Sequence, residues 1–384
     1  MIKKEWFYRN FKGDPIIWLI VLVLSLISLW VVYSATGPLA YKMAQGNTER
    51  YLLKHAVHIL VGLIAMWLTH RIDYKYFSAL ARVALWISVP LLFVVWKFGI
   101  NFNEASRSIN IPLINQAFQP SDLAKLALIA HLAGMLSRRQ QTIEDFKESL
   151  IPMLLWCGLI CGLIAMTNFS TGVLLFVTSM LVFFIGRVPL KYLAMLVVVG
   201  ILSGSIAFTI GQRGGTVAKR VQNFINPTEV SFQSEQGFIA IASGGITGKG
   251  PGKSSQRNIL PNSYDDFIFA IVIEEYGMIG GAFIVFLFLV LLYRGMRIAS
   301  RSDRAFGGLL SSGLSFAIVM QAMINMGVVT GLAPVTGLPL PLMSMGGTSL
   351  LFTGISLGMI LSVSRKNEAE EEFETIEGNV AKAA

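Results

Sequence analysis

Long apolar stretches recur along the whole chain, and they restrict its fold more than any other feature. Each is close to the roughly 20 apolar residues that a helix needs to cross a bilayer. Hydrophobic residues make up 54% of the sequence and charged residues only 14%, whereas about a quarter of a soluble domain is charged. We therefore predict an all-α polytopic membrane protein with about ten transmembrane helices, near residues 16–36, 52–69, 77–97, 119–137, 150–166, 170–186, 190–211, 267–293, 306–328 and 343–364.

The distribution of lysine and arginine predicts how the chain crosses the membrane. With an even number of spans both termini lie on one side, and the segments on that side carry most of these residues. Segments rich in lysine and arginine remain in the cytoplasm, and long loops weigh little in this rule. We expect cytoplasmic termini and one large extracytoplasmic loop, residues 212–265, between the seventh and eighth helices. The first stretch is too long for a signal peptide and is expected to remain as a helix.

The chain divides into a single membrane domain, residues 1–366, and an acidic tail, residues 367–384. The tail is rich in glutamate, and we predict it to be cytoplasmic and disordered, with partner binding as an alternative role. The whole chain has a formal net charge of +9. A nucleic-acid binder would gather its basic residues on a soluble face, so we expect no nucleic-acid partner. The two cysteines and four histidines exclude a disulfide scaffold and argue against a metal cage.

Lys125, Glu274 and Glu275 lie inside predicted membrane helices, where ionisable groups are costly unless they are paired or hydrated. Adjacent helical residues diverge by about 100°, so the two glutamates are not expected to face the same partner. We favour a structural role for them over a catalytic one. Either glutamate would form a buried ion pair with Lys125 or a bond to a neighbouring helix.

Arg107, Asp265 and Asp266 lie at the predicted outer rim of the membrane. Partial desolvation by the apolar residues that follow Asp266 would raise the basicity of a carboxylate, as a general base requires. The alternative is that either aspartate caps the start of the following helix. The spacing alone leaves both interpretations open.

The predicted external loop contains the glycine-rich segment GGITGKGPGKSS, residues 244–255. This segment lacks the glycine spacing and the strand-to-helix context of a phosphate-binding P-loop. Its lysines, Lys249 and Lys253, could still contact lipid phosphate. A solvated, flexible turn is the alternative.

Several long segments resemble the SEDS proteins (shape, elongation, division and sporulation), the family of the FtsW and RodA polymerases. They are SRSINI with FQPSDLAKLALI, then RVQNFINP, then the run from Gln233 and Ser234 through GGITGKGPGKSSQ to LPNSYDDFIFAIVIEEYG, and finally NMGVVTGLAPVTGLPLPLMSMGGTSLL. These segments occur in the family's order and are spread over most of the chain. The ten spans and the large loop also agree with the family's architecture.

The resemblance implies a peptidoglycan glycosyltransferase that polymerises lipid II with inversion and releases undecaprenyl pyrophosphate. It identifies Asp266 as the catalytic carboxylate. It also implies that Arg107 and Lys125 bind the substrate and neutralise the charge of its pyrophosphate. Further substrate-binding candidates are Lys249, Lys253, Gln233 and Ser234. Structural or secondary polar residues are Glu274, Glu275 and Asn325, which opens the last motif.

Two features qualify the resemblance. Residues 167–171, TNFST, lack a carboxylate that family members commonly carry there, so no secondary carboxylate is assigned at this place. The opening hydrophobic stretch resembles the division protein FtsW more than the elongation protein RodA. Septal wall synthesis during cell division is therefore expected, with control of cell shape during elongation as the alternative.

The resemblance also implies partners and a location. The expected partners are lipid II, a class B penicillin-binding protein, other divisome proteins and membrane lipid, and the location is the bacterial cytoplasmic (inner) membrane with the active site outside. No protein cage for a metal is expected, and a divalent cation, Mg²⁺ or Mn²⁺, would be shared with the substrate pyrophosphate. A lipid II flippase is the main rival and would depend on Lys125, Glu274 and Glu275. A scaffold would depend on no single carboxylate.

Overall fold

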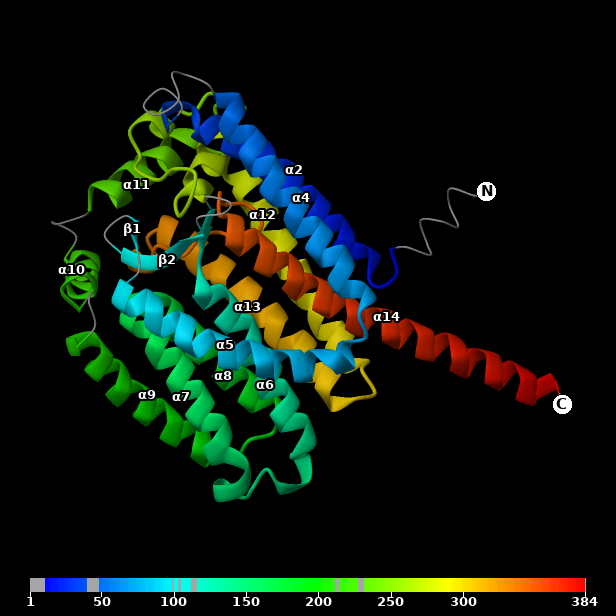
Figure 1. The fold of residues 1–384 in the computed structure, drawn as a ribbon. Coiled ribbons are helices and arrows are strands. Elements are labelled where there is room, and N and C mark those ends of the chain that lie inside the picture. Colours follow the sequence, from blue (N-terminus) through cyan, green and yellow to red (C-terminus); the bar gives the residue numbers. More distant parts are fainter. Residues whose placement is uncertain are drawn as a thin grey trace.

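A computed structural model describes residues 11–39, 48–98, 100–102, 105–111, 116–210, 214–226 and 231–383. Most of them form helices (Figure 1). The long helices are α2 (Pro15–Ala35), α4 (Thr48–Arg71), α5 (Phe77–Phe98), α6 (Pro120–Arg138), α7 (Ile151–Thr167), α8 (Phe169–Ile185), α9 (Leu190–Ile210), α10 (Gly214–Ile225), α11 (Phe232–Gly244), α12 (Ile268–Ser300), α13 (Ala305–Val329) and α14 (Gly347–Ala383). Short helical turns are η1 (Tyr74–Tyr76), η2 (Gln140–Thr142), η3 (Phe146–Leu150) and η5 (Gln256–Asn258).

Each predicted span coincides with a helix of the structure. Among the described helices, seven are long and apolar enough to cross a membrane: α2, α4, α5, α7, α12, α13 and α14, with α5 and α7 extended by the turns before them. Two shorter apolar helices, Phe169–Ile185 and Leu190–Leu202, fall within the sixth and seventh predicted spans. The chain is therefore a multi-pass membrane protein built of helices, and the exact number of spans stays a prediction.

Helices α6 and α13 form the centre of the bundle. Most side chains of both helices are buried, including Asp122, His131, Gln321 and Asn325. Helix α13 packs against α6, α8, α12 and α14. Because a helix buried on all sides contacts protein rather than lipid, its polar side chains can find partners within the bundle. Of the polar groups of the candidate site, α6 carries Lys125, and α13 carries Gln321 and Asn325.

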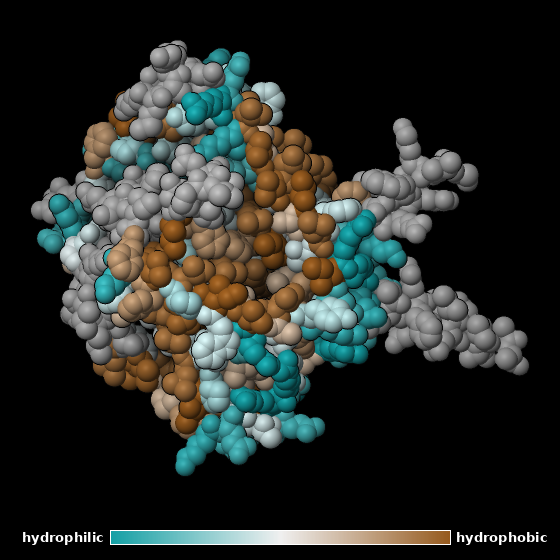
Figure 2. Space-filling model, in the orientation of Figure 1, coloured by the Kyte–Doolittle hydropathy of each residue, from teal (hydrophilic) through white to brown (hydrophobic). Residues whose placement is uncertain are grey.

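The outer helices present apolar side chains to the surroundings. Figure 2 shows a broad hydrophobic band across this face of the molecule, bordered by hydrophilic residues near the end from which α14 projects. Helices α2, α4 and α5 expose large apolar side chains, among them Leu22, Trp30, Leu60 and Trp86. In water such a surface would be costly, so the band is suited to the hydrocarbon region of a bilayer.

One end of the bundle is held together by Asp14. Its side chain accepts hydrogen bonds from the first backbone N–H groups of α2, as an N-cap residue before Pro15 does. The same carboxylate pairs with Arg294 near the end of α12, with Nε to Oδ2 at 2.6 Å, and its backbone N–H donates to Ser364 of α14. The start of α2 and the end of α12 therefore lie together, opposite the end where α12 begins.

The structure differs from the predicted organisation in three places. A small antiparallel sheet, β1 (Ile100–Phe102), β2 (Ala105–Ile111) and β3 (Gln116–Phe118), joins α5 to α6 in the order β1-β2-β3. The predicted loop 212–265 contains two helices, α10 and α11. Helix α14 continues through the acidic tail to Ala383, where a disordered segment is predicted. Alanine and glutamate favour helix, and extending a formed helix avoids the cost of nucleating one.

Candidate active site

Asp266 lies in the turn that leads into α12, and its side chain is half-buried. The next two residues, Phe267 and Ile268, are almost fully buried. The N-cap position of α12 is Phe267, which makes no side-chain cap bond. The sequence left capping open for Asp265 and Asp266, but neither holds the N-cap position. Asp266 instead places a carboxylate at the point where the chain enters the apolar interior.

Two buried polar side chains fix the backbone around this carboxylate. The amide of Asn325, on α13, donates to the Asp266 carbonyl at 2.8 Å and to the Leu338 carbonyl at 2.7 Å. The Ser344 hydroxyl donates to the Asp265 carbonyl at 2.6 Å. The motif that starts at Asn325 thus wraps around the aspartate pair.

Tyr264 adds a protonated hydroxyl next to the two aspartates. Its carbonyl accepts a hydrogen bond from the Met345 backbone N–H at 3.0 Å. Burial raises the pKa of the Tyr264 hydroxyl, and the negative charge of Asp265 adds to the shift. The hydroxyl is therefore protonated at neutral pH and able to donate.

Arg220, on α10, is a cation of this region that was not among the predicted site residues. It lines a cavity of about 300 Å³ together with the predicted Gln233 and Ser234. Burial lowers the pKa of Arg220, while the Asp266 carboxylate opposes this by raising it. Arg220 opens the RVQNFINP segment, which was noted only as a motif, and its helix was expected to be loop. Its position in that motif was the signal available.

Gln233 and Ser234 belong to the first turn of α11. The Gln233 amide donates to the Pro261 carbonyl at 3.3 Å, just before the turn that carries Asp266. The Ser234 hydroxyl lies 2.9 Å from that of Ser231, the N-cap residue of α11. Both predicted residues therefore lie beside the site, and Gln233 is bonded to the segment that positions it.

Lys125 lies deeper in the bundle, near the start of α6. Its Nζ pairs with Asp122 at 2.9 Å and donates to the Gln321 side chain at 3.3 Å. Gln321 in turn donates to the Pro339 carbonyl at 2.9 Å. Gln321 and Asn325 are one helical turn apart on α13, so they lie on the same face. That face links Lys125 to the backbone of Asp266.

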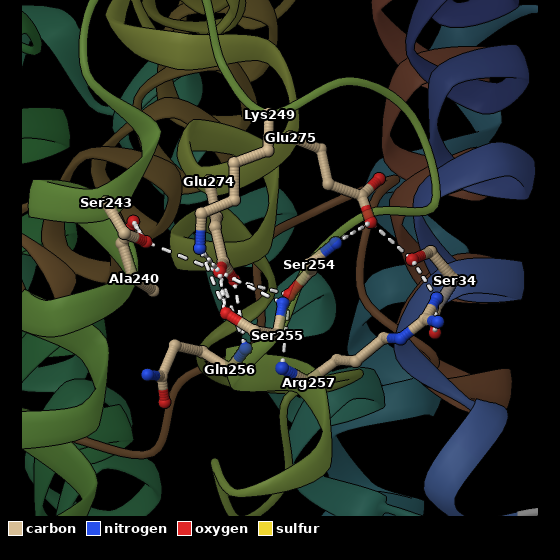
Figure 3. A network of polar contacts seen from close by, with 10 residues as sticks. All are labelled: Ser34, Ala240, Ser243, Lys249, Ser254, Ser255, Gln256, Arg257, Glu274 and Glu275. Atoms are coloured by element: carbon tan, nitrogen blue, oxygen red, sulfur yellow. Dashed lines mark hydrogen bonds and ion pairs between the residues drawn. The ribbon is translucent and has the colours of Figure 1, made fainter.

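Of the two alternatives predicted for the glutamates of α12, an ion pair with Lys125 is wrong, because Lys125 pairs with Asp122. The other alternative, a bond to a neighbouring helix, is met by Glu275 and Ser34 of α2. Glu274 is completely buried and pairs instead with Lys249 of the glycine-rich loop, with Nζ to Oε1 at 2.6 Å. Figure 3 shows Lys249, Ser254, Ser255 and Gln256 of the loop around this carboxylate. Its further donors are the hydroxyls of Ser243, Ser254 and Ser255 and the backbone N–H groups of Ser255 and Gln256.

Glu275 contacts the same loop, although adjacent helical residues were expected to face different partners. Its Oε1 accepts from the Ser254 backbone N–H at 3.4 Å and from the Ser34 hydroxyl. Arg257 donates to that Ser34 hydroxyl at 2.9 Å, which ties α2 to the loop (Figure 3). Ser254 therefore bonds to both glutamates, with its hydroxyl to Glu274 and its backbone N–H to Glu275.

The loop reaches this position because α12 is interrupted at Gly277, whose φ of 70° and ψ of −174° are not helical. In a continuous helix the N–H groups of Met278 and Ile279 would bond to the carbonyls of Glu274 and Glu275. Here they donate to Gly245 and Ile246, while the two carbonyls accept from Lys249 and Gly250. The loop replaces two helical hydrogen bonds by four of its own.

The structure does not place the other predicted substrate-binding cations, Arg107, Lys249 and Lys253, together beside Asp266. Arg107 lies on β2, but its side chain falls outside what the structure describes. Lys253 is exposed in the loop, whereas Lys249 is engaged with Glu274. The fold thus brings Asp266, Asn325, Gln233 and Ser234 together, and it gives Lys249 an internal partner.

Comparisons with known proteins agree over nearly the whole chain. The family model described as a cell cycle protein, for FtsW, RodA and SpoVE, matches residues 14–369. Stage V sporulation protein E of Bacillus subtilis (strain 168) is 34% identical over 367 residues, which cover 93% of this chain and 98% of the relative. The probable peptidoglycan glycosyltransferase FtsW of Geobacter sp. (strain M18) is 31% identical over 365 residues, with 93% and 98% covered.

Solved structures share the fold. One is a chain from a study of the structural coordination of polymerization and crosslinking by a peptidoglycan synthase complex, with a TM-score of 0.72, 24% identity, and coverage of 92% of this chain and 98% of that chain. Another is the rod shape determining protein RodA of Thermus thermophilus, with a TM-score of 0.67, 24% identity, and coverage of 92% and 97%. The resemblance seen in the sequence motifs is thereby confirmed, and this chain belongs to the FtsW, RodA and SpoVE family.

Proposed function

We propose that this protein is a peptidoglycan glycosyltransferase that polymerises lipid II into glycan strands during septal wall synthesis in cell division. The observation that carries the proposal is the position of Asp266, a half-buried carboxylate at the start of α12 whose backbone Asn325 holds in place. Relatives at 31% and 32% identity bear the name peptidoglycan glycosyltransferase FtsW, which supports the same activity and the division role.

In the proposed reaction Asp266 acts as a general base. Its carboxylate takes the proton from the 4-hydroxyl of the acceptor's GlcNAc, and that oxygen attacks the anomeric carbon of the growing chain's terminal MurNAc. The bond from that carbon to the pyrophosphate oxygen breaks as the new glycosidic bond forms. Undecaprenyl pyrophosphate leaves with the bonding electrons, and the configuration inverts from α to β.

The leaving pyrophosphate gains negative charge, which cations on the protein would stabilise. We assign this role to Lys125, with Arg107 as a further contributor. Lys125 retains a counter-charge in Asp122 and lines an internal cavity with Gln321 and Thr178. Lys253 is exposed and free to meet an arriving headgroup from the loop side.

A metal ion enters this proposal only through the substrate. Within the part of the chain that the structure describes, no three histidine, cysteine, aspartate or glutamate side chains come together in a group that could hold a metal. These residues therefore do not fit a protein cage, and the step above uses side chains alone. A divalent cation, Mg²⁺ or Mn²⁺, would be held by the substrate pyrophosphate together with a carboxylate and would stabilise the charge of the leaving group.

We place the protein in the bacterial cytoplasmic membrane with Asp266 on its outer face. The end of the bundle near Asp14 and Arg294 also carries Arg297, Arg301 and Arg304, as the cytoplasmic side of a membrane protein does. The opposite end carries Asp266. Lipid II headgroups would therefore meet the site from outside, while both termini stay in the cytoplasm.

We further propose a class B penicillin-binding protein and other divisome proteins as partners. A chain with this fold is described as acting in a peptidoglycan synthase complex that couples polymerization and crosslinking, which supports such an assembly. Helix α12 offers a surface for it, because Ile279, Phe283, Phe286 and Tyr293 expose apolar or aromatic side chains along one side.

The contacts of Glu274 favour a polymerase over a lipid II flippase. A flippase would use Lys125, Glu274 and Glu275 along one charged pathway. The two glutamates instead bond to loop 249–257, and Lys125 pairs with Asp122. These charges serve separate contacts, which leaves Asp266 as the carboxylate suited to the reaction.

The decisive experiment compares Asp266→Ala with Asp265→Ala in the purified protein, with its partner present and lipid II as substrate. Glycan chains are separated on a gel, and the initial rate is measured. Loss of a general base lowers the rate by roughly 10²- to 10⁴-fold, so we expect Asp266→Ala to make almost no chains and Asp265→Ala to remain active. Near wild-type synthesis by Asp266→Ala would refute the assignment. Loss of activity in Asp265→Ala alone would shift the base by one residue.

A further inference from the structure

The cavity beneath α10 has the composition of a binding site. It lies between α10, α11 and the segment after α13, and its volume is about 300 Å³. Five polar side chains line it: Arg220, Asn223, Ser231, Gln233 and Ser234. Apolar groups, among them Phe238 and Pro334, complete the wall. A mainly apolar hollow with a few polar groups that can fix orientation is typical of a site for an amphipathic ligand.

Arg220 gives this cavity a positive charge in a partly desolvated setting. The guanidinium has five N–H donors, and one of its groups, Nη1, donates to the Val335 carbonyl at 3.2 Å. Within the described part of the chain this is its one hydrogen bond. As far as the described residues go, the other N–H groups are available to a ligand, and the Asp266 carboxylate also acts on the guanidinium. A guanidinium matches the oxygens of a phosphate group in pairs, so an anionic phosphate fits it better than a neutral group does.

Helix α10 places this charge beside the membrane surface. Its apolar residues recur at helical spacing, and Val221, Phe224 and Ile225 are 41%, 46% and 68% exposed. Lys219 lies on the polar side and is also exposed. A short amphipathic helix with exposed apolar residues and basic neighbours lies in the interfacial region of a bilayer. We therefore expect Arg220 to lie near the depth of lipid phosphates.

One five-residue segment connects this cavity to the rest of the site. Arg220 bonds to its first residue, Val335, and Asn325, which holds Asp266, bonds to Leu338. Gln321, the partner of Lys125, bonds to Pro339. Residues 335–339 therefore contact both sites, directly through Arg220 and through Gln321 for Lys125. Asn325 links Asp266 to the same segment.

We propose that the cavity lined by Arg220 binds the pyrophosphate and adjoining sugar of an isoprenyl-linked saccharide, with Arg220 on the phosphate and the Asn, Gln and Ser side chains on the sugar. The inference rests on the proposed function, because a polymerase must hold two lipid-linked saccharides at once. With Lys125 serving one pyrophosphate, the Arg220 cavity serves the other. Asp266 then lies where the two sugars meet.

The test measures binding of undecaprenyl pyrophosphate to the full-length protein in phosphatidylcholine nanodiscs, with inorganic pyrophosphate as a second probe. Arg220→Gln should weaken undecaprenyl pyrophosphate binding about tenfold, which corresponds to about 1.4 kcal/mol. Lys219→Gln is the matched control, since it removes the same charge from the neighbouring exposed position and should leave binding unchanged. Arg220→Lys should fall between wild type and Arg220→Gln. Weaker binding of inorganic pyrophosphate than of the lipid is expected, because the free ion lacks the apolar contacts of the isoprenyl chain.

A second pair of variants guards against misfolding of Arg220→Gln. Asn223→Asp puts a negative charge into the cavity at nearly constant size, while Gln222→Glu puts it on the exposed side of the same helix. Only Asn223→Asp should weaken binding and raise the KM for lipid II, with kcat less affected. Thermal melting in the same nanodiscs checks that all variants are folded.

The outcomes separate this inference from the proposed function. Asp266→Asn should bind undecaprenyl pyrophosphate normally and yet make no glycan. If Arg220→Gln and Asn223→Asp bind like wild type, or if the two control variants lose as much affinity, the Arg220 cavity is not the site. If Asp266→Asn still polymerises lipid II, the proposed base is wrong whatever Arg220 does.

Discussion

The ion pair between Lys249 and Glu274 offers a sharp test of how the glycine-rich loop is held. Glu274 is 0% exposed, and the Lys249 side chain, at 31% exposure, reaches it from the loop. The perturbation is Lys249→Met, which keeps the length of the side chain and removes its charge. Glu274→Gln is the reciprocal change, and the double variant removes the charges of both partners.

The size of the effect follows from burial. Removing one partner of a fully buried ion pair costs about 3–5 kcal/mol, but the exposed part of Lys249 is screened by solvent. Glu274 also keeps the hydroxyl and N–H donors of Ser255. We therefore expect Lys249→Met to lower the free energy of unfolding by about 2 kcal/mol. Glu274→Gln should cost about 3 kcal/mol, because buried donors lose their charged acceptor.

The assay is denaturant unfolding in detergent micelles, followed by tryptophan fluorescence, with a double-mutant cycle over the four forms. The double variant should lose roughly 1–2 kcal/mol less than the sum of the single changes, since each single change already breaks the pair. Lys253→Met is the matched control, an exposed lysine in the same loop, and should change stability by less than about 0.5 kcal/mol.

Two results would refute this reasoning. If Lys249→Met and Lys253→Met have the same effect, Lys249 is not a partner of a buried charge. If the single changes add without coupling, Lys249 and Glu274 do not interact, and Lys249 remains available as a ligand for lipid phosphate, as the sequence had suggested.

Two further substitutions test other parts of the site. Asn325→Ala removes the donors to the Asp266 and Leu338 carbonyls, so we expect a loss of stability of about 1–3 kcal/mol for each carbonyl left unpaired. We also expect a lower kcat, with a smaller change in the KM for lipid II. An unchanged kcat would show that Asn325 does not position Asp266. Gly277→Ala would place a Cβ 2.1 Å from the Ile246 carbonyl oxygen at a φ of 70°, and we expect it to prevent stable folding. Gly158→Ala is the control and should be neutral or slightly stabilising, because its Cβ meets nothing within 4 Å. Equal thermal melting of the two variants would argue against the close approach at Gly277.

The membrane helices could be predicted from the sequence because length and apolarity alone define them. Each of the predicted spans, including the one that starts near Pro120, coincides with a helix. The same reasoning could place Asp266 at the start of α12, because the boundary between polar and apolar residues is sharp there. Its catalytic assignment came from the family resemblance and stays a proposal.

The contacts of the site could not be predicted in the same way. The positive charge of Lys125 and its position inside a predicted membrane helix suggested it as a partner of Glu274. The loop instead places Lys249 beside that carboxylate. That path depends on the break at Gly277, which a hydropathy pattern does not reveal, since a glycine inside an apolar stretch is compatible with an unbroken helix. Arg220 could not be identified for a related reason, because the twelve residues of α10 lie within the segment predicted as the external loop.

The backbone hydrogen bonds between the loop and α12 around Gly277 limit how far a substitution at Glu274 or Lys249 can release the loop. If the loop left α12, the N–H groups of Met278 and Ile279 and the carbonyls of Glu274 and Glu275 would lose their partners, unless the helix closed again. Unpaired backbone groups at membrane depth cost several kcal/mol each. Closing the helix is opposed in turn, because Gly277 would have to change its φ from 70° to the negative value of a helix while the loop gave up its own bonds. Loss of the Lys249 ion pair should therefore loosen residues 251–257 without releasing residues 244–250, whose backbone bonds to α12 remain. Asp266 stays anchored through Asn325 in either case, so a Lys249 variant should lose stability before it loses its catalytic rate.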